Sequence, residues 1–302
     1  MLKEPILFDH LTKLPTNQVG LAVLGYPIKH SISPEIHTAA LHVLAHSADE
    51  YSKWSYEKIE VHPHSLAKAL PILADYGYRG LNLTIPHKVE VLPHLPSMDE
   101  QARIMGAVNT LCWERGGWKG YNTDGVGLSR AIEDAFNLPL GEFNVVVLGA
   151  GGAARAAVAQ CIFEGCQNIA LYNRTRDRAR ELVSALKENG IEREVCLLES
   201  FTNPFAGLNE PVVVINATAL GLRPEDPSPV DLSGLDGNFH VYDMVYNPPV
   251  TQLLRNAMET GYPVANGLGM LVGQAARSLE IWSGQEVSVR AMSEAAQAAV
   301  LS

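Results

Sequence analysis

Three polar residues, Asn82, Thr84 and Lys88, stand at and just beyond the end of a short apolar segment, residues 80–85. The leucine and isoleucine pattern of this segment predicts a β-strand. Open α/β sheets bind their ligands outside the carboxyl ends of their strands. These side chains are therefore candidates for ligand binding. Taken alone, Lys88 is equally consistent with a surface lysine that begins a helix.

Two serines, Ser31 and Ser33, follow a predicted strand at residues 19–25. Pro34 suits the first turn of a helix that runs to about His46, with Ser33 as its N-cap. Two hydroxyls and the unpaired N–H groups of a helix start also form an anion site, which a carboxylate would fit. If Ser33 only caps the helix, there is no such site.

Gly149, Gly151 and Gly152 separate an uncharged β-branched run, residues 145–148, from an alanine-rich stretch, residues 153–163. This order predicts a strand, a tight turn and a helix. Glycines let the backbone approach a ligand closely, and the helix start offers N–H groups and a positive dipole end. The turn suits a pyrophosphate, although a glycine turn alone also occurs in α/β domains that bind none.

A second predicted strand, residues 168–173, ends where a dinucleotide fold places its ribose-reading residue. Asn173, Arg174 and Thr175 stand there, with Arg178 close behind and no lone acidic residue. Guanidinium groups form charge-assisted, bidentate hydrogen bonds with phosphate oxygens. We therefore predict NADP rather than NAD as the cofactor. The alternative is that these arginines are solvated charges at the start of a helix.

Two further polar residues allow an ordinary structural explanation and a functional one. Asp124 follows a predicted hairpin, 109–121, and Asp often simply caps the helix that comes next, here residues 125–136. Gln274 lies on a predicted amphipathic helix, residues 270–282, where a solvated glutamine is common. Sequence alone favours the structural explanation for both.

The composition of the chain limits the classes of function. With 302 residues the chain is long enough for two domains. Its net charge is -10, and positive and negative residues are mixed throughout, so no basic patch indicates nucleic-acid binding and binding to acidic membranes is disfavoured. The four cysteines lie in apolar segments without metal-ligand spacing, which predicts buried free thiols. There is no signal-peptide pattern and no apolar run of membrane-spanning length. A cytoplasmic enzyme is expected.

Alternating elements continue after the glycines. The pattern predicts a helix at 176–189, strands at 195–198, 212–216 and 240–245, and a helix that ends before Gly261. Such alternation favours a parallel sheet covered on both faces.

With these residues in hand, the chain resembles the shikimate dehydrogenase family, including its quinate/shikimate variants. The matching blocks stand in the family's order and together are highly specific: GYPIKHSISPEIH at 25–37, NLTIPHK at 82–88, GAVNT at 106–110, GYNTD at 120–124, GAGGAAR at 149–155, NRT at 173–175, NAT at 216–218, DMVYNP at 243–248 and NGLGMLVGQ at 266–274.

The resemblance implies an α/β fold with two domains around a cleft. A substrate domain, residues 1–123, would be completed by residues 268–302, and a Rossmann-like, doubly wound NADP-binding domain would span residues 124–267. The implied reaction is the NADP-dependent, reversible reduction of 3-dehydroshikimate to shikimate, in aromatic amino acid biosynthesis. No metal is implied, and the molecule would be a monomer or a homodimer.

By matching motifs, Lys88 and Asp124 would be the catalytic pair. Ser31 and Ser33 would hold the substrate carboxylate. The residues that would bond ring hydroxyls are Asn82, Thr84, Asn109, Asp124 and Gln274, and Tyr246 would line the substrate side. The cofactor-binding set would be Gly149, Ala150, Gly151, Gly152, Ala153, Asn173, Arg174, Thr175, Arg178, Thr218, Met244 and Gly267, the last two near the nicotinamide.

The chain departs from the family pattern in two places. Thr38 follows His37 where the family often has Asn, and residues 219–222 (ALGL) follow NAT where a Ser or Thr and then Gly-Met are common. The second departure removes a hydroxyl from the cofactor side. The rival interpretations are an NAD-linked quinate/shikimate dehydrogenase on the same scaffold and a catalytically silent NADP-sensing protein.

Overall fold

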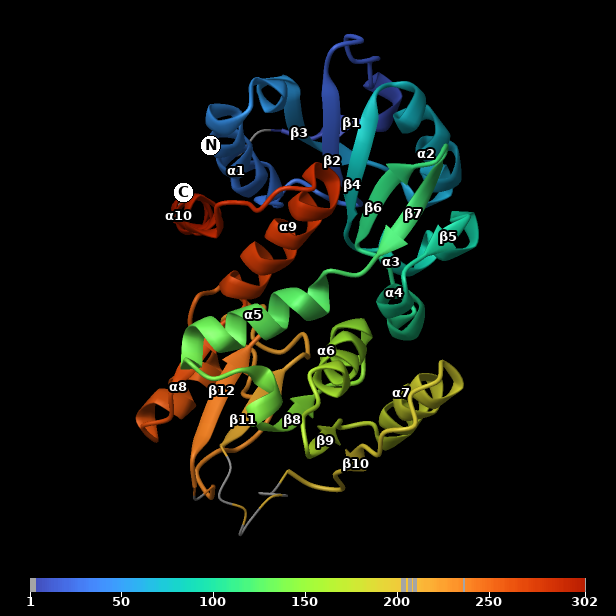
Figure 1. Cartoon of the computed structure of the whole chain (residues 1–302). Helices are drawn as coiled ribbons and strands as arrows, with labels where there is room; N and C mark the ends of the chain where they lie inside the picture. The colour runs from blue at the N-terminus through green and yellow to red at the C-terminus, as the bar shows by residue number, and fades with distance from the viewer. Residues whose placement is uncertain (1–3, 202–204, 206–207, 209–210, 236, 302) are drawn as a thin grey trace. The chain divides into compact units, whose positions relative to one another are not determined.

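The structure is a computed structural model, which describes residues 4–201, 205, 208, 211–235 and 237–301. The chain divides into two compact units. The first comprises Met1–Thr123 and Gln274–Ser302, and the second comprises Asp124–Gly273. The boundary at 273/274 lies six residues beyond the one expected from sequence at 267/268, because helix α9 (Leu268–Ser283) contributes its first residues to the second unit. Each unit is coloured along the chain in Figure 1.

The first unit is built on a seven-stranded mixed sheet in the order β1-β3-β2-β4-β6-β7-β5. Its strands are β1 (Ile6–Leu7), β2 (Val19–Gly25), β3 (Trp54–Glu60), β4 (Tyr78–Leu83), β5 (Ser97–Met98), β6 (Thr110–Glu114) and β7 (Gly117–Tyr121). Its helices are α1 (Ser33–Ser47), α2 (Leu66–Asp75), α3 (His87–Glu90), α4 (Glu100–Met105) and α10 (Val289–Val300), with the second half of α9 (Leu268–Ser283).

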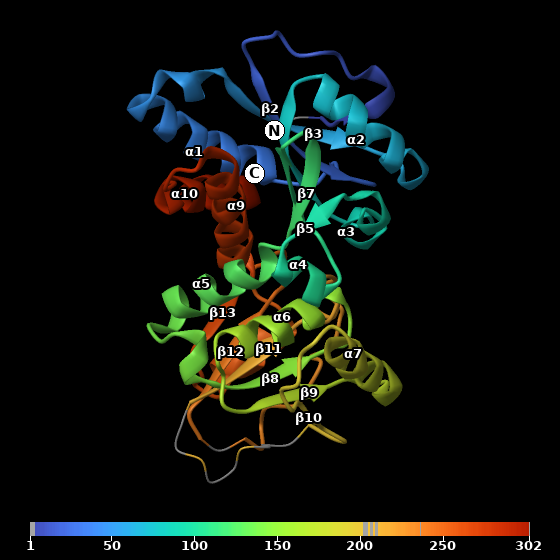
Figure 2. The same ribbon diagram turned by 45° about the vertical axis from the view of Figure 1, so that its right-hand side comes forward.

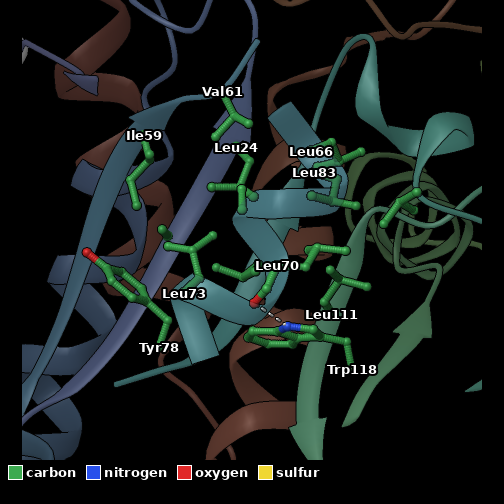
Figure 3. Close-up of a cluster of buried hydrophobic side chains, with 14 of the residues drawn as sticks. Leu24, Ile59, Val61, Leu66, Leu70, Leu73, Tyr78, Leu83, Leu111 and Trp118 are labelled. Carbon is green, nitrogen blue, oxygen red and sulfur yellow. Dashed lines mark hydrogen bonds between the residues drawn. The ribbon is translucent and has the colours of Figure 1, made fainter. Parts of the chain in front are cut away.

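Helices α1 and α10 lie together on one side of this sheet and α2 on the other (Figures 1 and 2). Under α2, leucines of the helix and strands form a core with Trp118, whose indole N–H donates to the Leu70 carbonyl at 2.9 Å (Figure 3). On the opposite face, the Trp282 ring of α9 covers Gly80, where an added Cβ would lie 2.5 Å from the indole. The sheet is therefore fixed on both faces.

The second unit has a six-stranded, all-parallel sheet in the order β10-β9-β8-β11-β12-β13. The strands are β8 (Asn144–Leu148), β9 (Ile169–Tyr172), β10 (Cys196–Leu197), β11 (Val212–Asn216), β12 (Phe239–Asp243) and β13 (Val264–Asn266). The helices are α5 (Asp124–Phe136), α6 (Gly152–Phe163), α7 (Arg176–Glu188), α8 (Gln252–Glu259) and the start of α9.

Numbered along the chain, these strands follow the order 3-2-1-4-5-6 of a dinucleotide-binding doubly wound sheet. Every residue of β8 and β11 is buried, as expected for parallel strands covered on both faces. Val146, Leu148 and Val214 pack in one core with Leu253 and Leu254 of α8. The predicted fold class, two α/β units with the second doubly wound, is confirmed.

Two local predictions were wrong. Ile32, not Ser33, occupies the N-cap position of α1, and Ser33 is the first helical residue, because the Ser31 hydroxyl already accepts the Ser33 N–H at 3.3 Å. All four cysteines are free thiols, but only Cys161 and Cys166 are buried. Cys196 is exposed because β10 is a two-residue edge strand, and Cys112 is half-buried.

Candidate functional site

The Ser31–Ser33 turn presents two hydroxyls at the start of α1. The Ser31 hydroxyl donates to Ser33 Oγ at 3.2 Å, and the α1 N-cap makes no side-chain hydrogen bond. In the first helical turn, Ser31 Oγ accepts the Ser33 N–H at 3.3 Å and the Ile32 carbonyl accepts the Ile36 N–H at 3.3 Å. Pro34 has no N–H. The two serine hydroxyls are therefore the main donors that this turn could offer an anion, and the anion site stays a prediction.

Asn82 is the penultimate residue of β4 and lies in the interior of the first unit. Its Oδ1 accepts a hydrogen bond from the Tyr56 hydroxyl at 2.7 Å, and its Nδ2 lies 3.0 Å from Ser278 Oγ and 3.1 Å from Thr110 Oγ1. With 5% of its surface exposed, Asn82 is held by protein groups on both ends of its amide. One lone pair of Oδ1 is not used by these bonds.

Lys88 is half-buried on the short helix α3, which follows the β4 strand directly. Its neighbour His87 fixes this helix, since the His87 ring is fully buried and its Nε2 lies 2.8 Å from the Val61 carbonyl. The Lys88 carbonyl also accepts the Val108 N–H at 2.8 Å. Thr84 connects to the same loop, because its carbonyl accepts the His87 N–H at 2.8 Å. The backbone of Thr84 and Lys88 is therefore tightly held.

Asn109 and Gln274 meet within the first unit. The Asn109 Nδ2 donates to Gln274 Oε1 at 3.3 Å and to Thr123 Oγ1 at 2.9 Å, and Asn109 Oδ1 accepts the Thr123 N–H at 2.8 Å. The fold thus brings together two residues that are 165 positions apart in the chain. Gln274 is not the solvated helical glutamine that sequence alone favours.

Asp124 is the first residue of α5 and begins the second unit. It is half-buried and interacts with the rest of the protein. Lys88 belongs to the first unit, so the pairing of the two residues stays a prediction.

In the second unit the glycine turn joins β8 to α6 as predicted. Gly149 has a φ of +113°, and a Cβ there would lie 3.0 Å from the Ala217 carbonyl oxygen, so the tight turn requires glycine. At Gly151 and Gly152 a Cβ would meet no atom within 4 Å. The helix start at Gly151 has no side-chain cap, which leaves its N–H groups for an anion.

The arginines after β9 fall into two groups. Arg176 pairs with Glu199 at 3.2 Å, and Arg180 pairs with Asp177 at 2.9 Å. Arg174 and Arg178 are exposed, and neither forms a salt bridge with a carboxylate of the described residues. Asn173 is fixed by its own turn, where its Nδ2 donates to the Thr175 carbonyl at 2.7 Å. Two guanidinium groups thus remain for a phosphate.

The loop after β11 is held by internal bonds. The Thr218 hydroxyl donates to Asn216 Oδ1 at 2.7 Å and accepts the Leu220 N–H at 3.1 Å, while Asn216 Nδ2 donates to the Leu220 carbonyl at 3.1 Å. Ala219, the departure from the family pattern, is exposed and contributes no side-chain bond to this scaffold. The loop keeps its shape without the missing hydroxyl.

Met244, Tyr246 and Gly267 lie around the end of β12. Asp243 is fully buried and fixes this end by accepting hydrogen bonds from Asn216, the Val245 N–H and Thr251, and burial raises its pKa. A Cβ on Gly267 would lie 2.0 Å from the Met244 carbonyl oxygen, so these two backbones approach as only glycine allows. Tyr246 is half-buried, and burial raises its pKa.

Sequence reasoning missed the residues that hold the first-unit set in place. Tyr56, Thr110, Thr123 and Ser278 are buried and bond Asn82 or Asn109. His37 is fully buried and stacks on Tyr56 with ring centroids 4.0 Å apart, and burial lowers its pKa to about 3. Helical spacing was the available signal, because Ser278 follows Gln274 by four residues and His37 follows Ser33 by four.

Among the described residues, no cluster of three or more His, Cys, Asp or Glu side chains has the arrangement of a metal site. No described helix combines the length and the apolar character needed to cross a membrane.

Comparison with known proteins assigns the family. Residues 23–111 match the shikimate dehydrogenase substrate binding domain, residues 131–221 match shikimate / quinate 5-dehydrogenase, and residues 267–297 match the shikimate 5'-dehydrogenase C-terminal domain. The shikimate dehydrogenase (NADP(+)) of Methanopyrus kandleri is 39% identical over 93% of this chain and 94% of its own length.

Solved structures agree with this assignment. The shikimate 5-dehydrogenase of Thermus thermophilus, solved in complex with NADP(H) and shikimate, is 32% identical with a TM-score of 0.79 and covers 93% of this chain and 100% of its own. The 5-ketofructose reductase of Gluconobacter is 29% identical with a TM-score of 0.81 and covers 94% and 99%. The chain belongs to the shikimate dehydrogenase family.

Proposed function

We propose that this protein is an NADP-dependent shikimate dehydrogenase that interconverts shikimate and 3-dehydroshikimate. The observation that carries the proposal is the conjunction of the Lys88 helix with the Asn82, Asn109 and Gln274 amides in the first unit of a chain 39% identical to the Methanopyrus enzyme. A lysine whose backbone is bonded to Val108, the residue before Asn109, suits proton transfer at a polyhydroxylated ring that these amides would bind.

The first unit, as the substrate domain, would bind shikimate through its side chains. Ser31 and Ser33, at the start of α1, would hold the carboxylate through their hydroxyls. Thr84, Asn109 and Gln274 would bond ring hydroxyls together with Asp124 from the second unit. Asn82 would contribute the free lone pair of its Oδ1, since its Nδ2 hydrogens are directed at protein oxygens.

Lys88 would move the proton. In the oxidation of shikimate, neutral Lys88 accepts the proton of the reacting hydroxyl, and in the reverse direction its ammonium donates a proton to the carbonyl oxygen as negative charge grows there. Asp124 would orient the Lys88 amine and the adjacent hydroxyl.

The second unit would bind the cofactor. The residues fit NADP, because the Gly149–Gly152 turn leaves space and unpaired N–H groups for a pyrophosphate, and Arg174 and Arg178 are exposed with no carboxylate partner in the described chain. When bound, the nicotinamide would accept a hydride in the oxidation and donate one in the reduction. Ala150, Ala153, Asn173, Thr175 and Thr218 would line the nucleotide, and Met244 and Gly267 would lie by the nicotinamide with Tyr246 toward the substrate.

One assay tests the proposal. Purified protein is given shikimate or quinate with NADP or NAD, and the absorbance of the reduced cofactor is followed in all four combinations. Shikimate with NADP is expected to react fastest. Preferred turnover of quinate with NAD would replace the proposal with the NAD-linked alternative, and cofactor binding without turnover would support a silent sensor. Reduction of 5-ketofructose is a further arm, since a ketofructose reductase shares the fold.

We also propose a cytoplasmic protein, either a monomer or a homodimer, that contacts neither nucleic acid nor membrane. The net charge of -10, with positive and negative residues mixed along the chain, supports the absence of nucleic-acid binding. Light scattering at several concentrations would distinguish the two oligomeric states.

A further inference from the structure

Ser278 lies one helical turn after Gln274 on α9, and its side chain is fully buried. Its hydroxyl is 2.9 Å from the Gln274 carbonyl, 2.8 Å from Thr110 Oγ1, 3.2 Å from Thr123 Oγ1 and 3.0 Å from Asn82 Nδ2. We propose that Ser278 is a positioning residue for substrate binding, acting through the amides of Asn82, Asn109 and Gln274. This inference rests on the proposed function.

The hydrogen bonds around Asn82 define the orientation of its amide. Tyr56 donates its only hydroxyl proton to Asn82 Oδ1, so the oxygen end faces Tyr56. The Nδ2 end faces Ser278 Oγ, which can accept because the Ser278 proton is directed at the Gln274 carbonyl. Ser278 therefore holds the Nδ2 end together with the Asn109 carbonyl at 3.2 Å and Thr110 Oγ1 at 3.1 Å, and Tyr56 holds the opposite end.

Three hydroxyls connect the Asn82 amide to the Asn109 amide. The oxygens of Thr110, Thr123 and Ser278 lie within 2.8–3.3 Å of one another, and all three side chains are buried. Thr110 and Thr123 both bond Asn109 Oδ1, and Asn109 Nδ2 then donates to Gln274 Oε1 at 3.3 Å. Ser278 therefore contacts the backbone of Gln274 directly and its side chain through Thr123 and Asn109.

The competing explanation is an ordinary helical serine that bonds the carbonyl four residues back. The same helix contains that case. The Ser283 hydroxyl donates to the Leu279 carbonyl at 2.7 Å and accepts the Gln285 N–H, and it makes no contact with the three-hydroxyl cluster. Ser283 is a matched control for Ser278.

The test compares Ser278→Ala and Ser283→Ala with the wild type. We expect Ser278→Ala to lower kcat/KM for shikimate about tenfold, because Asn82 Nδ2 keeps only the Asn109 carbonyl and Thr110 Oγ1 as acceptors and the ligand-binding amides lose part of their fixed orientation. The KM for NADP should not change, since the cofactor groups lie in the second unit. Ser283→Ala should stay within about twofold of the wild type.

Two further variants keep the proposal falsifiable. Ser278→Cys preserves the volume of the side chain but only weakly donates and accepts, so it should reproduce the kinetic loss if the Ala variant does not fold. Tyr56→Phe releases the other end of the Asn82 amide, and combined with Ser278→Ala it should lower kcat/KM by more than the product of the single losses.

The outcomes separate the two ideas. Wild-type turnover of shikimate with NADP decides the proposed function before any variant is measured, and its absence removes the basis of the inference as well. With an active wild type, the positioning role is overturned if the Ser278 variants lower only the melting temperature, or if Ser278→Ala and Ser283→Ala have equal effects. A kinetic loss confined to the KM for NADP would overturn it too.

Discussion

In the first unit the candidate binding groups are side chains that bond one another, whereas in the second unit they are mainly backbone N–H groups and exposed arginines. Asn109 makes hydrogen bonds with Thr123 and Gln274, but Arg174 and Arg178 stand alone beyond β9. Changes in the first set should therefore be coupled to one another. Changes in the second should act independently, so that their effects on binding multiply.

The largest expected effect separates the chemistry from cofactor binding. Lys88→Ala should lower turnover by about 10²–10⁴-fold, because the general acid–base group is lost. The affinity for NADP should be nearly unchanged, as measured by fluorescence titration. Lys68→Ala, an exposed lysine of α2, is the control. Near-normal turnover of Lys88→Ala would mean that this lysine is only a surface or contact residue.

A substitution of Asp124 tests whether this residue acts together with Lys88. Asp124→Asn should also be harmful, and the Lys88→Ala/Asp124→Asn double variant should lose less than the product of the two single losses, because residues that act as a unit are not additive. Losses in kcat that simply multiply would contradict the catalytic pair.

Alanine substitutions at two glycines of the β8–α6 turn should affect different properties, one the stability of the fold and the other the affinity for NADP. Gly149→Ala should lower the free energy of unfolding by about 1–3 kcal/mol, since φ is +113° and its Cβ would meet the Ala217 backbone. Gly151→Ala adds a Cβ where no atom lies within 4 Å, so the fold should be kept while NADP affinity falls about 10–100-fold. Urea unfolding and NADP titration of both variants distinguish these results. Unchanged NADP affinity in Gly151→Ala would argue against a pyrophosphate at this turn.

The exposed arginines should act separately and more weakly. Arg174→Ala and Arg178→Ala should each weaken NADP binding about tenfold, with NAD binding unaffected, because only NADP carries the 2′-phosphate and the exposed charges are partly screened. Arg180→Ala, an arginine already paired with Asp177, is the control. Equal losses for NADP and NAD would exclude the 2′-phosphate role.

The smallest expected effect concerns stability. Burial lowers the pKa of His37 to about 3, so between pH 6.5 and pH 3 the unfolded chain binds a proton there that the folded protein does not. Stability from this group is complete above pH 6.5 and falls with decreasing pH, by about 1 kcal/mol near pH 6. His37→Phe keeps a ring on Tyr56 and should flatten the pH dependence of unfolding relative to wild type. His46→Phe, at an exposed position on the same helix, is the control, and an unchanged slope in His37→Phe would refute this account.

Elements with a continuous local pattern were predictable from the sequence. The apolar run of β11 was predicted residue for residue at 212–216, because a strand buried on both faces needs no partner to be recognised. The two-residue strands β1 and β5 carry no such pattern and exist only through pairing with β3 and β7. Sequence analysis gave no indication of either.

The candidate site shows the same limit. The family's matching motifs were enough to nominate Lys88, Asn109 and Gln274. The hydroxyl cluster around Ser278 joins β6, residue Thr123 and α9, which only tertiary packing brings together. The start of α1 differed from the prediction for a local reason. The Ser31 hydroxyl accepts the Ser33 N–H, and Ile32, not Ser33, occupies the N-cap position. Propensity rules do not resolve competition between neighbouring serines.

The division of the chain has a consequence for how the protein is made. The second unit is one continuous segment, whereas the first needs residues on both sides of it. During synthesis, residues before Asp124 leave the ribosome long before Ser278 and Trp282 are translated. Until then, Gly80 is not covered by the Trp282 ring, and Asn82 lacks its hydrogen bond with Ser278. Pulse-labelled hydrogen exchange on stalled nascent chains should find β8 and β11 protected before β4. We therefore expect the first unit, most of which is translated first, to complete its folding last.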